Sequence, residues 1–346
     1  MLARHVATVL LVVGIAAAGC SGSSGGSDAG EAENDTGAVS DATPADATPA
    51  DAAAPDAGVD ETADPVPDLP AAEEIVPDVP AGPAPAEPLK YSEGHCPTFV
   101  AGKNDFKSAG RNRTAYVYLP AEPKGAPVLF IFHGQGDTGK SIAEYFGGDA
   151  ITKTYGAIVV SPSNCCAVSG TDCCDMMTVW GYAPFSDHEP DVTLFDDILS
   201  CLEEQFDVDN SRVYATGFSA GALWTTWLAM NRSDYLAAAA IFSGGVGQMC
   251  EYTQPTYKIP ALLAWGGQTD TYTGFVKFYE MMNAFSQNLQ EAGHLVVECD
   301  HGLGHTMPWG STKWALEFLM AHTWYDGSSP FVHGLSSSFP KYCVIP

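Results

Sequence analysis

The chain has 346 residues, a formal net charge of −27 and 10 cysteines. The charge is uneven, because residues 21–92 hold sixteen acidic side chains and one basic one, Lys90. Neither this segment nor the moderately acidic remainder suits nucleic acid, whose phosphates need a basic surface, so no nucleic-acid partner is expected. Residues 93–346 are numerous enough to bury one substantial core, and we expect them to form a single domain.

The first twenty residues have the pattern of an export signal. A basic N-terminal end precedes an apolar run over residues 6–18, which is short for a membrane span and ends in small residues. Cys20 directly follows Ala17-Ala18-Gly19 and resembles a bacterial lipobox, with Ala17 where leucine is usual. We expect residues 1–20 to be a lipoprotein signal and Cys20 to carry a lipid that anchors the exported protein to a membrane. An ordinary cleaved signal is the alternative.

Residues 21–92 have the composition of a tether. They contain many prolines and carboxylates, Asp-Ala-Thr-Pro-Ala repeats over residues 41–50, and no aromatic residue before Tyr91. Such a segment buries too little apolar area to offset its ordering entropy. We expect it to be disordered, and its prolines and like charges to keep it extended.

From residue 93 onward, apolar runs bounded by turn signals alternate with helical patterns. This alternation predicts an α/β fold with a mostly parallel sheet and helices on both faces. Ligands bind such sheets at the carboxyl ends of the strands. The expected strands are 114–119, 127–132, 157–161, 213–216, 236–242, 261–265 and 295–299, and the expected helices are 191–206, 220–231, 275–292 and 311–322.

The loop after the strand at 127–132 begins His133-Gly134-Gln135-Gly136. A strand followed by His-Gly is typical of a loop that supplies a backbone N–H to an oxyanion hole. We expect the Gln135 amide to be that donor, with a plain glycine turn as the alternative.

The cysteines of an exported chain indicate disulfides. Without Cys20 nine remain, so one thiol should stay free. The cluster Cys165-Cys166…Cys173-Cys174 lacks the spacing of a zinc ribbon and favours two short cross-links in a surface loop. Two further pairs are suggested, Cys96–Cys343, which lie near the two ends of the domain, and Cys250–Cys299, although sequence alone does not determine the connectivity.

Residues 217–221, Gly-Phe-Ser-Ala-Gly, lie between a short strand pattern and a helical pattern. G-x-S-x-G in that context is the nucleophile elbow of α/β-hydrolases. Glycines at 217 and 221 remove side chains that would collide in the strained turn. Ser219 is therefore the candidate nucleophile, and the Ala220 amide is the candidate second oxyanion donor.

A serine nucleophile needs a general base and an acid that orients the base, in the order Ser, Asp, His. Asp270 follows a glycine turn after the strand at 261–265 and is the candidate acid, with Glu280 and Glu298 as weaker alternatives. The loop after the last strand holds His301 and His305. We favour His305 as the base, because His301 lies too near the strand end to reach the serine freely.

Several of these blocks resemble the feruloyl esterase and polyhydroxybutyrate depolymerase group of α/β-hydrolases. The similar blocks are Arg113 to Pro120, Val128 to Gly136, Asp191-Val192, Val208 to Gly221 and Gly302 to Pro308, and together they cover most of residues 104–322. The resemblance implies Ser219, Asp270 and His305 as the triad and esters of aromatic acids or polyesters as substrates. The cysteine-rich loop at 165–188 and Ala222-Leu223-Trp224 after the elbow depart from the family pattern.

The sequence thus predicts an exported serine ester hydrolase, monomeric and without metal or organic cofactor. Its substrate would be a feruloyl or acetyl ester of plant polysaccharide, or a polyhydroxyalkanoate-type polyester. A binding lipoprotein without activity and a serine peptidase on the same fold are the alternatives. Four apolar side chains near the site are candidates for the substrate pocket: Trp180, Tyr272, Met307 and Trp309.

Overall fold

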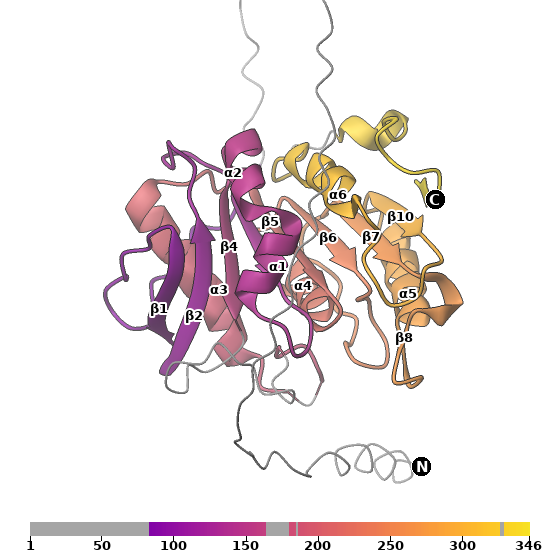
Figure 1. The fold of residues 1–346 in the computed structure, drawn as a ribbon, viewed down its shortest axis with the longest axis horizontal. Helices are drawn as coiled ribbons and strands as arrows, with labels where there is room; N and C mark the ends of the chain where they lie inside the picture. The colour runs from indigo at the N-terminus through magenta and orange to yellow at the C-terminus, as the bar shows by residue number, and fades with distance from the viewer. Residues whose placement is uncertain (1–82, 164–179, 185, 326–328) are drawn as a thin grey trace, which may run out of the picture. The chain divides into compact units, whose positions relative to one another are not determined.

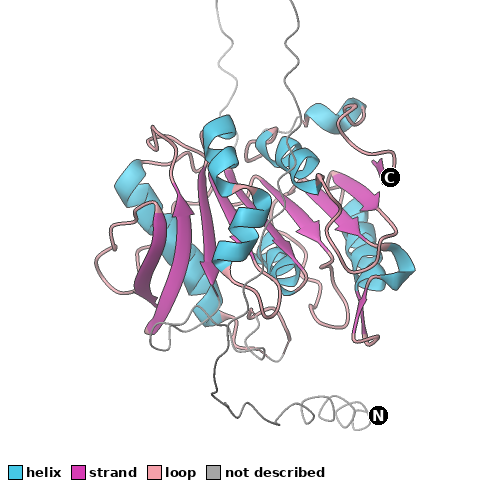
Figure 2. Ribbon diagram, in the orientation of Figure 1, coloured by secondary structure: helices cyan, strands magenta, loops and turns pink. Residues whose placement is uncertain are grey.

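The structure is a computed structural model that describes residues 83–163, 180–184, 186–325 and 329–346. These residues form a nine-stranded sheet in the order β1-β2-β4-β3-β5-β6-β7-β10-β11 and a separate pair, β8-β9 (Figures 1 and 2). The strands are β1 (Gly102–Ser108), β2 (Arg111–Tyr118), β3 (Val128–Phe132), β4 (Ile158–Ser163), β5 (Val213–Phe218), β6 (Ala238–Phe242), β7 (Ala261–Trp265), β8 (Thr271–Tyr272), β9 (Val276–Lys277), β10 (Val296–Asp300) and β11 (Cys343–Val344). The α-helices are α1 (Gly139–Phe146), α2 (Gly148–Tyr155), α3 (Glu189–Phe206), α4 (Ala220–Asn231), α5 (Phe278–Glu291) and α6 (Ser311–Met320), and short 3₁₀ helices cover Gly267–Thr269 and Pro330–His333.

The centre of the sheet is parallel. Strands β4, β3, β5, β6, β7 and β10 pair in parallel, whereas β1, β2 and β11 pair antiparallel at the two edges. Parallel neighbours bring their carboxyl ends to one edge, so the loops after β3, β5, β7 and β10 meet there. The predicted mostly parallel sheet is confirmed.

Both faces of the sheet are covered, as continuous apolar strands require. Phe130 and Phe132 pack with α3, α4 and α5, while Leu129 and Ile131 of the same strand pack with α1, α2 and α6. Figure 1 shows these two groups of helices on opposite faces. Every residue of β3 is therefore buried, and its end is a fixed point from which the next loop starts.

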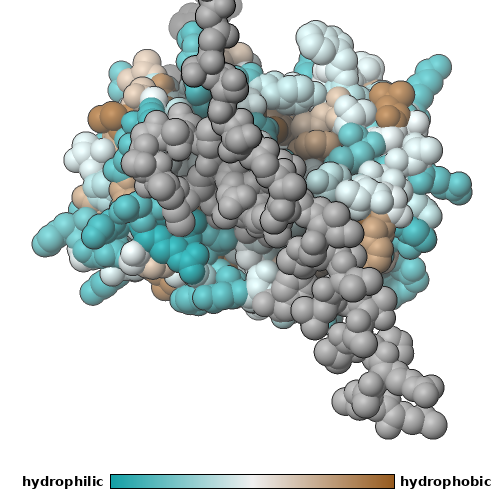
Figure 3. Space-filling model, turned by 60° about the horizontal axis from the view of Figure 1, so that its bottom comes forward, coloured by the Kyte–Doolittle hydropathy of each residue, from teal (hydrophilic) through white to brown (hydrophobic). Residues whose placement is uncertain are grey.

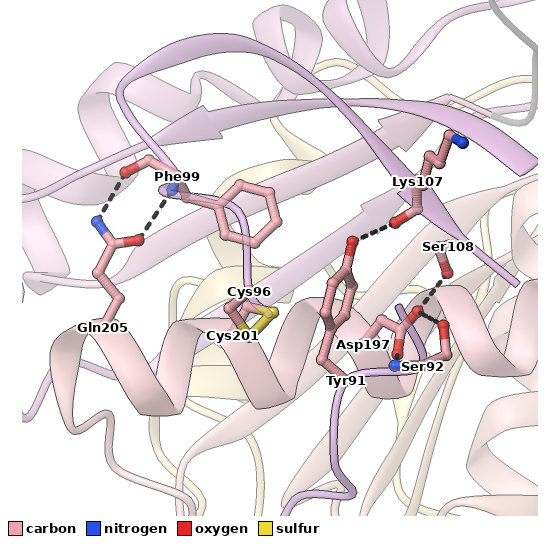
Figure 4. Close-up of a disulfide and its surroundings, with 9 residues drawn as sticks. All are labelled: Tyr91, Ser92, Cys96, Phe99, Lys107, Ser108, Asp197, Cys201 and Gln205. Atoms are coloured by element: carbon pink, nitrogen blue, oxygen red, sulfur yellow. Dashed lines mark hydrogen bonds between the residues drawn. A yellow bond between two sulfur atoms is a disulfide. The ribbon is translucent and has the colours of Figure 1, made fainter. Parts of the chain in front are cut away.

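The segment that enters the domain is fastened along α3 (Figure 4). The backbone N–H and Oγ of Ser92 both donate to Asp197, and Cys96 forms a disulfide with Cys201. Residues 83–92, which the sequence assigns to the tether, already contact this domain, since Ala86 N donates to Asp234 O.

The predicted disulfide pairs Cys96–Cys343 and Cys250–Cys299 are wrong. Cys96 pairs with Cys201, and Cys299 pairs with Cys343 across β10 and β11. The partners are determined by where α3 and β11 pack in the fold, because Cys201 lies on α3 and Cys343 lies on β11. Distance along the chain does not reveal this packing. Cys250 is the free, buried cysteine of the described chain. The expected cross-links at 165–174 lie outside the described residues.

Strand β1 and helices α1 and α2 were not predicted, and neither were the two-residue strands β8, β9 and β11 or the short 3₁₀ helices. Strand β1 alternates exposed polar and buried positions at the sheet edge. Helices α1 and α2 have eight residues each and meet at Gly147, which takes a left-handed conformation with φ of 77°. Within the described residues, no helix has the length and apolar character needed to cross a membrane.

Candidate active site

Ser219 occupies the turn between β5 and α4. Its φ of 56° and ψ of −118° are unusual for a residue with a side chain and mark a strained backbone. A Cβ at Gly217 would lie 2.5 Å from Gly221 O, and a Cβ at Gly221 would lie 2.1 Å from Phe132 O. The two glycines are thus required by close backbone contacts with each other and with β3.

His305 lies beside this serine. Its Nε2 is 2.9 Å from Ser219 Oγ, and its Nδ1 is 2.7 Å from Asp270 Oδ1. The imidazole stacks on Phe278, with ring centroids 4.5 Å apart, and on Phe218 on the elbow, at 4.9 Å. Two aromatic faces therefore hold the ring in the plane that joins the carboxylate to the hydroxyl.

Asp270 is fully buried and its hydrogen bonds are well defined. Besides the His305 ring, it accepts from Gly266 N at 2.9 Å and from Ser243 Oγ at 2.8 Å, both on Oδ2. These two donors fix the orientation of the carboxyl group, so that its Oδ1 faces the imidazole. A carboxylate oxygen only accepts, so Nδ1 carries the ring proton and Nε2 is left to accept from Ser219.

The loops that carry Asp270 and His305 touch through two glycines. Gly304 N donates to Gly266 O at 2.9 Å. A Cβ on Gly266 would lie 1.9 Å from Gly304 O, so a side chain there would push the loops apart. This contact sets the distance between acid and base.

The alternative acid and base residues lie elsewhere. Glu280 is exposed and pairs with Lys277 at 2.9 Å, and Glu298 accepts from Ser286 on α5. The His301 ring faces Tyr342 at 6.3 Å, its Nδ1 accepts from Leu303 N, and burial lowers its pKa. The structure thus brings Ser219, His305 and Asp270 together. The alternatives Glu280, Glu298 and His301 make their contacts elsewhere.

The predicted oxyanion loop passes directly over the elbow. A Cβ at Gly134 would lie 3.4 Å from Ser219 Cβ, and Gln135 follows it. On the other side, Ala220 is the first residue of α4, where backbone N–H groups have no acceptor within the helix. The helix N-terminus also favours negative charge. Both predicted donors belong to segments that border Ser219.

The four predicted pocket residues differ in their surroundings. Tyr272 is 41% exposed, with its ring 6.4 Å from that of His305, and Trp309 is 99% exposed just beyond the histidine loop. Met307 is partly buried and its carbonyl accepts from Tyr145 Oη. Trp180 is only 1% exposed and packs in the core, so no face of it is open to a substrate in this structure.

Ser243, whose hydroxyl donates to Asp270, was not among the predicted site residues. Its position at the end of β6, between two strands with predicted site loops, was the available signal. In the described parts of the chain, no group of three or more His, Cys, Asp or Glu side chains is arranged to hold a metal ion.

Comparison with known proteins gives a consistent result. Residues 107–323 match the family model Esterase, described as "Putative esterase". The chain is 25% identical over 167 residues to "Putative esterase NocK" of Nocardia uniformis subsp. tsuyamanensis, covering 46% of this chain and 45% of that protein. It is 27% identical over 143 residues to poly(3-hydroxyalkanoate) depolymerase C of Paucimonas lemoignei, covering 41% and 34%. The matches thus span less than half the length of these curated relatives.

Solved structures share the fold. Native sOPH superposes with a TM-score of 0.61 at 21% identity, covering 74% of this chain and 96% of that one. Native pOPH gives 0.59 at 20% identity, covering 73% and 97%. Together with the sheet order and the elbow, these likenesses show the α/β-hydrolase fold that was predicted.

Proposed function

We propose that this chain, which belongs to the esterase family, hydrolyses carboxylic esters through Ser219, His305 and Asp270. The observation that carries the proposal is the continuous hydrogen-bonded row from Asp270 Oδ1 through the His305 ring to Ser219 Oγ, with links of 2.7 and 2.9 Å. Three separate loops at one sheet edge supply these residues. A buried acid, an oriented imidazole and a serine in a strained elbow together make the arrangement of an activated nucleophile.

The reaction would proceed in two halves. Ser219 Oγ attacks the ester carbonyl carbon while His305 Nε2 takes the hydroxyl proton, and Asp270 stabilises the imidazolium. The tetrahedral intermediate collapses, the C–O bond to the alcohol breaks, and His305 returns the proton to the leaving alcohol. Water then attacks the acyl-enzyme with His305 as base, which releases the carboxylic acid and restores Ser219.

The negative oxygen of each intermediate would be held by the amides of Ala220 and Gln135. Ala220 adds the positive end of α4 to its N–H. Such preorganised donors are worth about 10²–10³-fold each in kcat. The close approach of Gly134 to Ser219 supports the assignment of Gln135, because no side chain separates that loop from the reacting centre.

The substrate would present an apolar surface. The loops that carry Asp270 and His305 expose several large apolar side chains, here named the apolar rim. Tyr145, whose hydroxyl donates to the histidine loop, continues it. The apolar rim comprises Tyr145, Tyr272, Phe275, Leu303 and Trp309. Figure 3 shows hydrophobic side chains among hydrophilic ones on the part of the described surface that it displays.

An apolar rim favours a polyester chain or an aromatic ester over a small acetyl group, since aromatic side chains contribute most when they cover apolar area. The similarity to poly(3-hydroxyalkanoate) depolymerase C of Paucimonas lemoignei supports the first of these. We therefore propose a polyhydroxyalkanoate-type polyester or a feruloyl ester as the substrate.

We also propose that the protein acts outside the cytoplasm, lipid-anchored through Cys20. The disulfides Cys96–Cys201 and Cys299–Cys343 support export, because disulfides persist in oxidising compartments.

A substrate panel tests the proposal. The full chain is assayed with p-nitrophenyl acetate, p-nitrophenyl butyrate, methyl ferulate and a short hydroxybutyrate oligomer. We expect turnover of the esters with apolar acyl groups and higher kcat/KM for butyrate than for acetate. Ser219→Ala should abolish all turnover, whereas the exposed control Ser336→Ala should keep it. Hydrolysis by the Ser219→Ala protein would overturn the assignment of the nucleophile, and an inactive wild type would overturn ester hydrolysis itself.

A further inference from the structure

Trp180 occupies a place that neither a substrate contact nor simple core packing accounts for. Its indole packs edge-on against Phe132 at the end of β3, with centroids 5.3 Å apart and planes at 81°. It also lies parallel to the ring of Trp224 on α4, at 6.5 Å. The residue therefore fills the space between the strand that leads to the predicted oxyanion loop and the helix that follows the nucleophile.

The indole makes one directed contact from this place. Its Nε1 donates to the carbonyl oxygen of His133 at 3.0 Å, in a buried environment. That same oxygen would lie 2.6 Å from a Cβ at Gly221, so the backbone of α4 confines it from the other side. The His133 carbonyl belongs to the peptide that leads into Gly134 and Gln135. Its orientation therefore determines how this loop leaves the strand.

Trp180 is itself held by a rigid support. Gly181 N donates to Asp191 Oδ2 at 2.9 Å, at the start of α3. Asp191 forms a buried ion pair with Arg113 of β2, with Nη2 2.9 Å from Oδ1, and the same Nη2 donates to Pro190 O. A buried ion pair with hydrogen bonds from fixed elements resists displacement. The support joins β2, α3 and the Trp180 backbone into one unit.

We propose that Trp180 is a positioning residue that aims the Gln135 amide at the oxyanion through its hydrogen bond to the His133 carbonyl. The inference rests on the proposed function, since it assigns a role within that site. Trp180 does not touch the substrate. It fixes the peptide before Gly134, and Gly134 lies so close to the elbow that a Cβ placed on it would contact Ser219 Cβ at 3.4 Å. An oxyanion donor works only when it is placed before the charge develops, so a small rotation of this loop lowers kcat and not substrate affinity.

Trp224 supplies a matched control. It belongs to the same stack of rings and is fully buried, but its Nε1 has no hydrogen-bond partner among the residues that the structure describes. Trp180→Phe removes a used N–H and Trp224→Phe an unused one, while both leave an aromatic ring. A third variant carries benzothienylalanine at position 180, which keeps the shape of the indole and lacks the N–H.

The test measures kcat and KM for p-nitrophenyl butyrate and the inhibition constant of a trifluoromethyl ketone, whose adduct with serine mimics the oxyanion. Thermal unfolding is recorded for each variant. We expect Trp180→Phe and the benzothienylalanine variant to lower kcat about 10-fold or more. This factor corresponds to the free energy of the one buried hydrogen bond that each variant loses. KM should stay within about twofold and the ketone should bind more weakly by the same factor as kcat falls. Trp224→Phe should leave kcat, KM and the inhibition constant of the ketone unchanged.

Three outcomes overturn the proposal. An unchanged kcat in the benzothienylalanine variant shows that the N–H is not needed, even where Trp180→Phe fails to fold. A higher KM with unchanged kcat shows a substrate contact instead. An equal loss in Trp224→Phe shows that ring packing is responsible. The wild type and Ser219→Ala are assayed first. If the wild type is inactive, or if Ser219→Ala stays active, the proposed function fails before the Trp180 variants are measured.

Discussion

Replacement of Asp270 by asparagine tests how the His305 ring is oriented. Asp270 Oδ2 accepts from Gly266 N, a backbone donor that cannot reverse its role, and from Ser243 Oγ. An asparagine must therefore keep its oxygen on that side and turn its NH₂ toward His305 Nδ1. The ring then has to accept at Nδ1, which moves its proton to Nε2, facing Ser219 Oγ. In this tautomer His305 cannot take the serine proton.

The size of the effect follows from the loss of the base. A triad whose imidazole is held in the wrong tautomer loses about 10,000-fold in kcat, equivalent to about 5.4 kcal/mol of transition-state stabilisation. The residual rate comes from the oxyanion donors and substrate binding, so KM should change little. Stopped assays with p-nitrophenyl butyrate at neutral pH measure the loss, and thermal unfolding checks that the variant is folded.

Glu298→Gln is the matched control, because Glu298, the alternative acid within β10, hydrogen-bonds to Ser286 instead of His305. It should retain wild-type kcat. A loss of less than about 10-fold in Asp270→Asn, in a folded protein, would refute the reasoning about the tautomer. A large loss of kcat in Glu298→Gln would show that Asp270 is not the acid that orients His305.

Three further predictions concern the elbow, the C-terminal strand and the pH dependence of stability. Gly221→Ala places a Cβ 2.1 Å from Phe132 O and should lower kcat about 100-fold through displacement of Ser219; activity above a tenth of wild type would contradict this. Replacing both Cys299 and Cys343 by alanine removes a cross-link that spans 44 residues and should lower the free energy of unfolding by about 4 kcal/mol, with an unchanged urea midpoint as the opposing result. Burial lowers the pKa of His294 below 6.5 in the folded protein. As the pH falls, the unfolded chain therefore binds a proton at this residue before the folded protein does. The free energy of unfolding should thus decline as the pH falls below about 6.5. Urea unfolding at about pH 7.5 and about pH 5.5 should show a smaller decline in His294→Gln than in wild type, and equal declines would count against this cause.

The central strands and the site loops could be predicted because their signals are local. Val128 to Phe132 is an unbroken apolar run, which a strand buried on both faces requires, and Gly217 to Gly221 carries its turn geometry in five residues. The order of Ser219, Asp270 and His305 along the chain then sufficed to bring them to one edge, since parallel strands align their carboxyl ends.

What could not be predicted depends on contacts between distant segments. Cys96 pairs with Cys201 because residues 91–99 run along α3, and nothing in the spacing of the cysteines encodes that path. Trp180 was expected near the substrate because aromatic residues line apolar pockets. In the structure its ring packs against Phe132 and Trp224, which lie 48 and 44 positions away along the chain.

Labelling with a fluorophosphonate followed by mass spectrometry tests the central claim most directly. The probe reacts with a serine only where a base removes its proton and donors hold the phosphoryl oxygen. We predict a single adduct on the peptide that contains Ser219 and none in the Ser219→Ala protein. An adduct on another residue, or wild-type labelling that persists in Ser219→Ala, would contradict the account of this site.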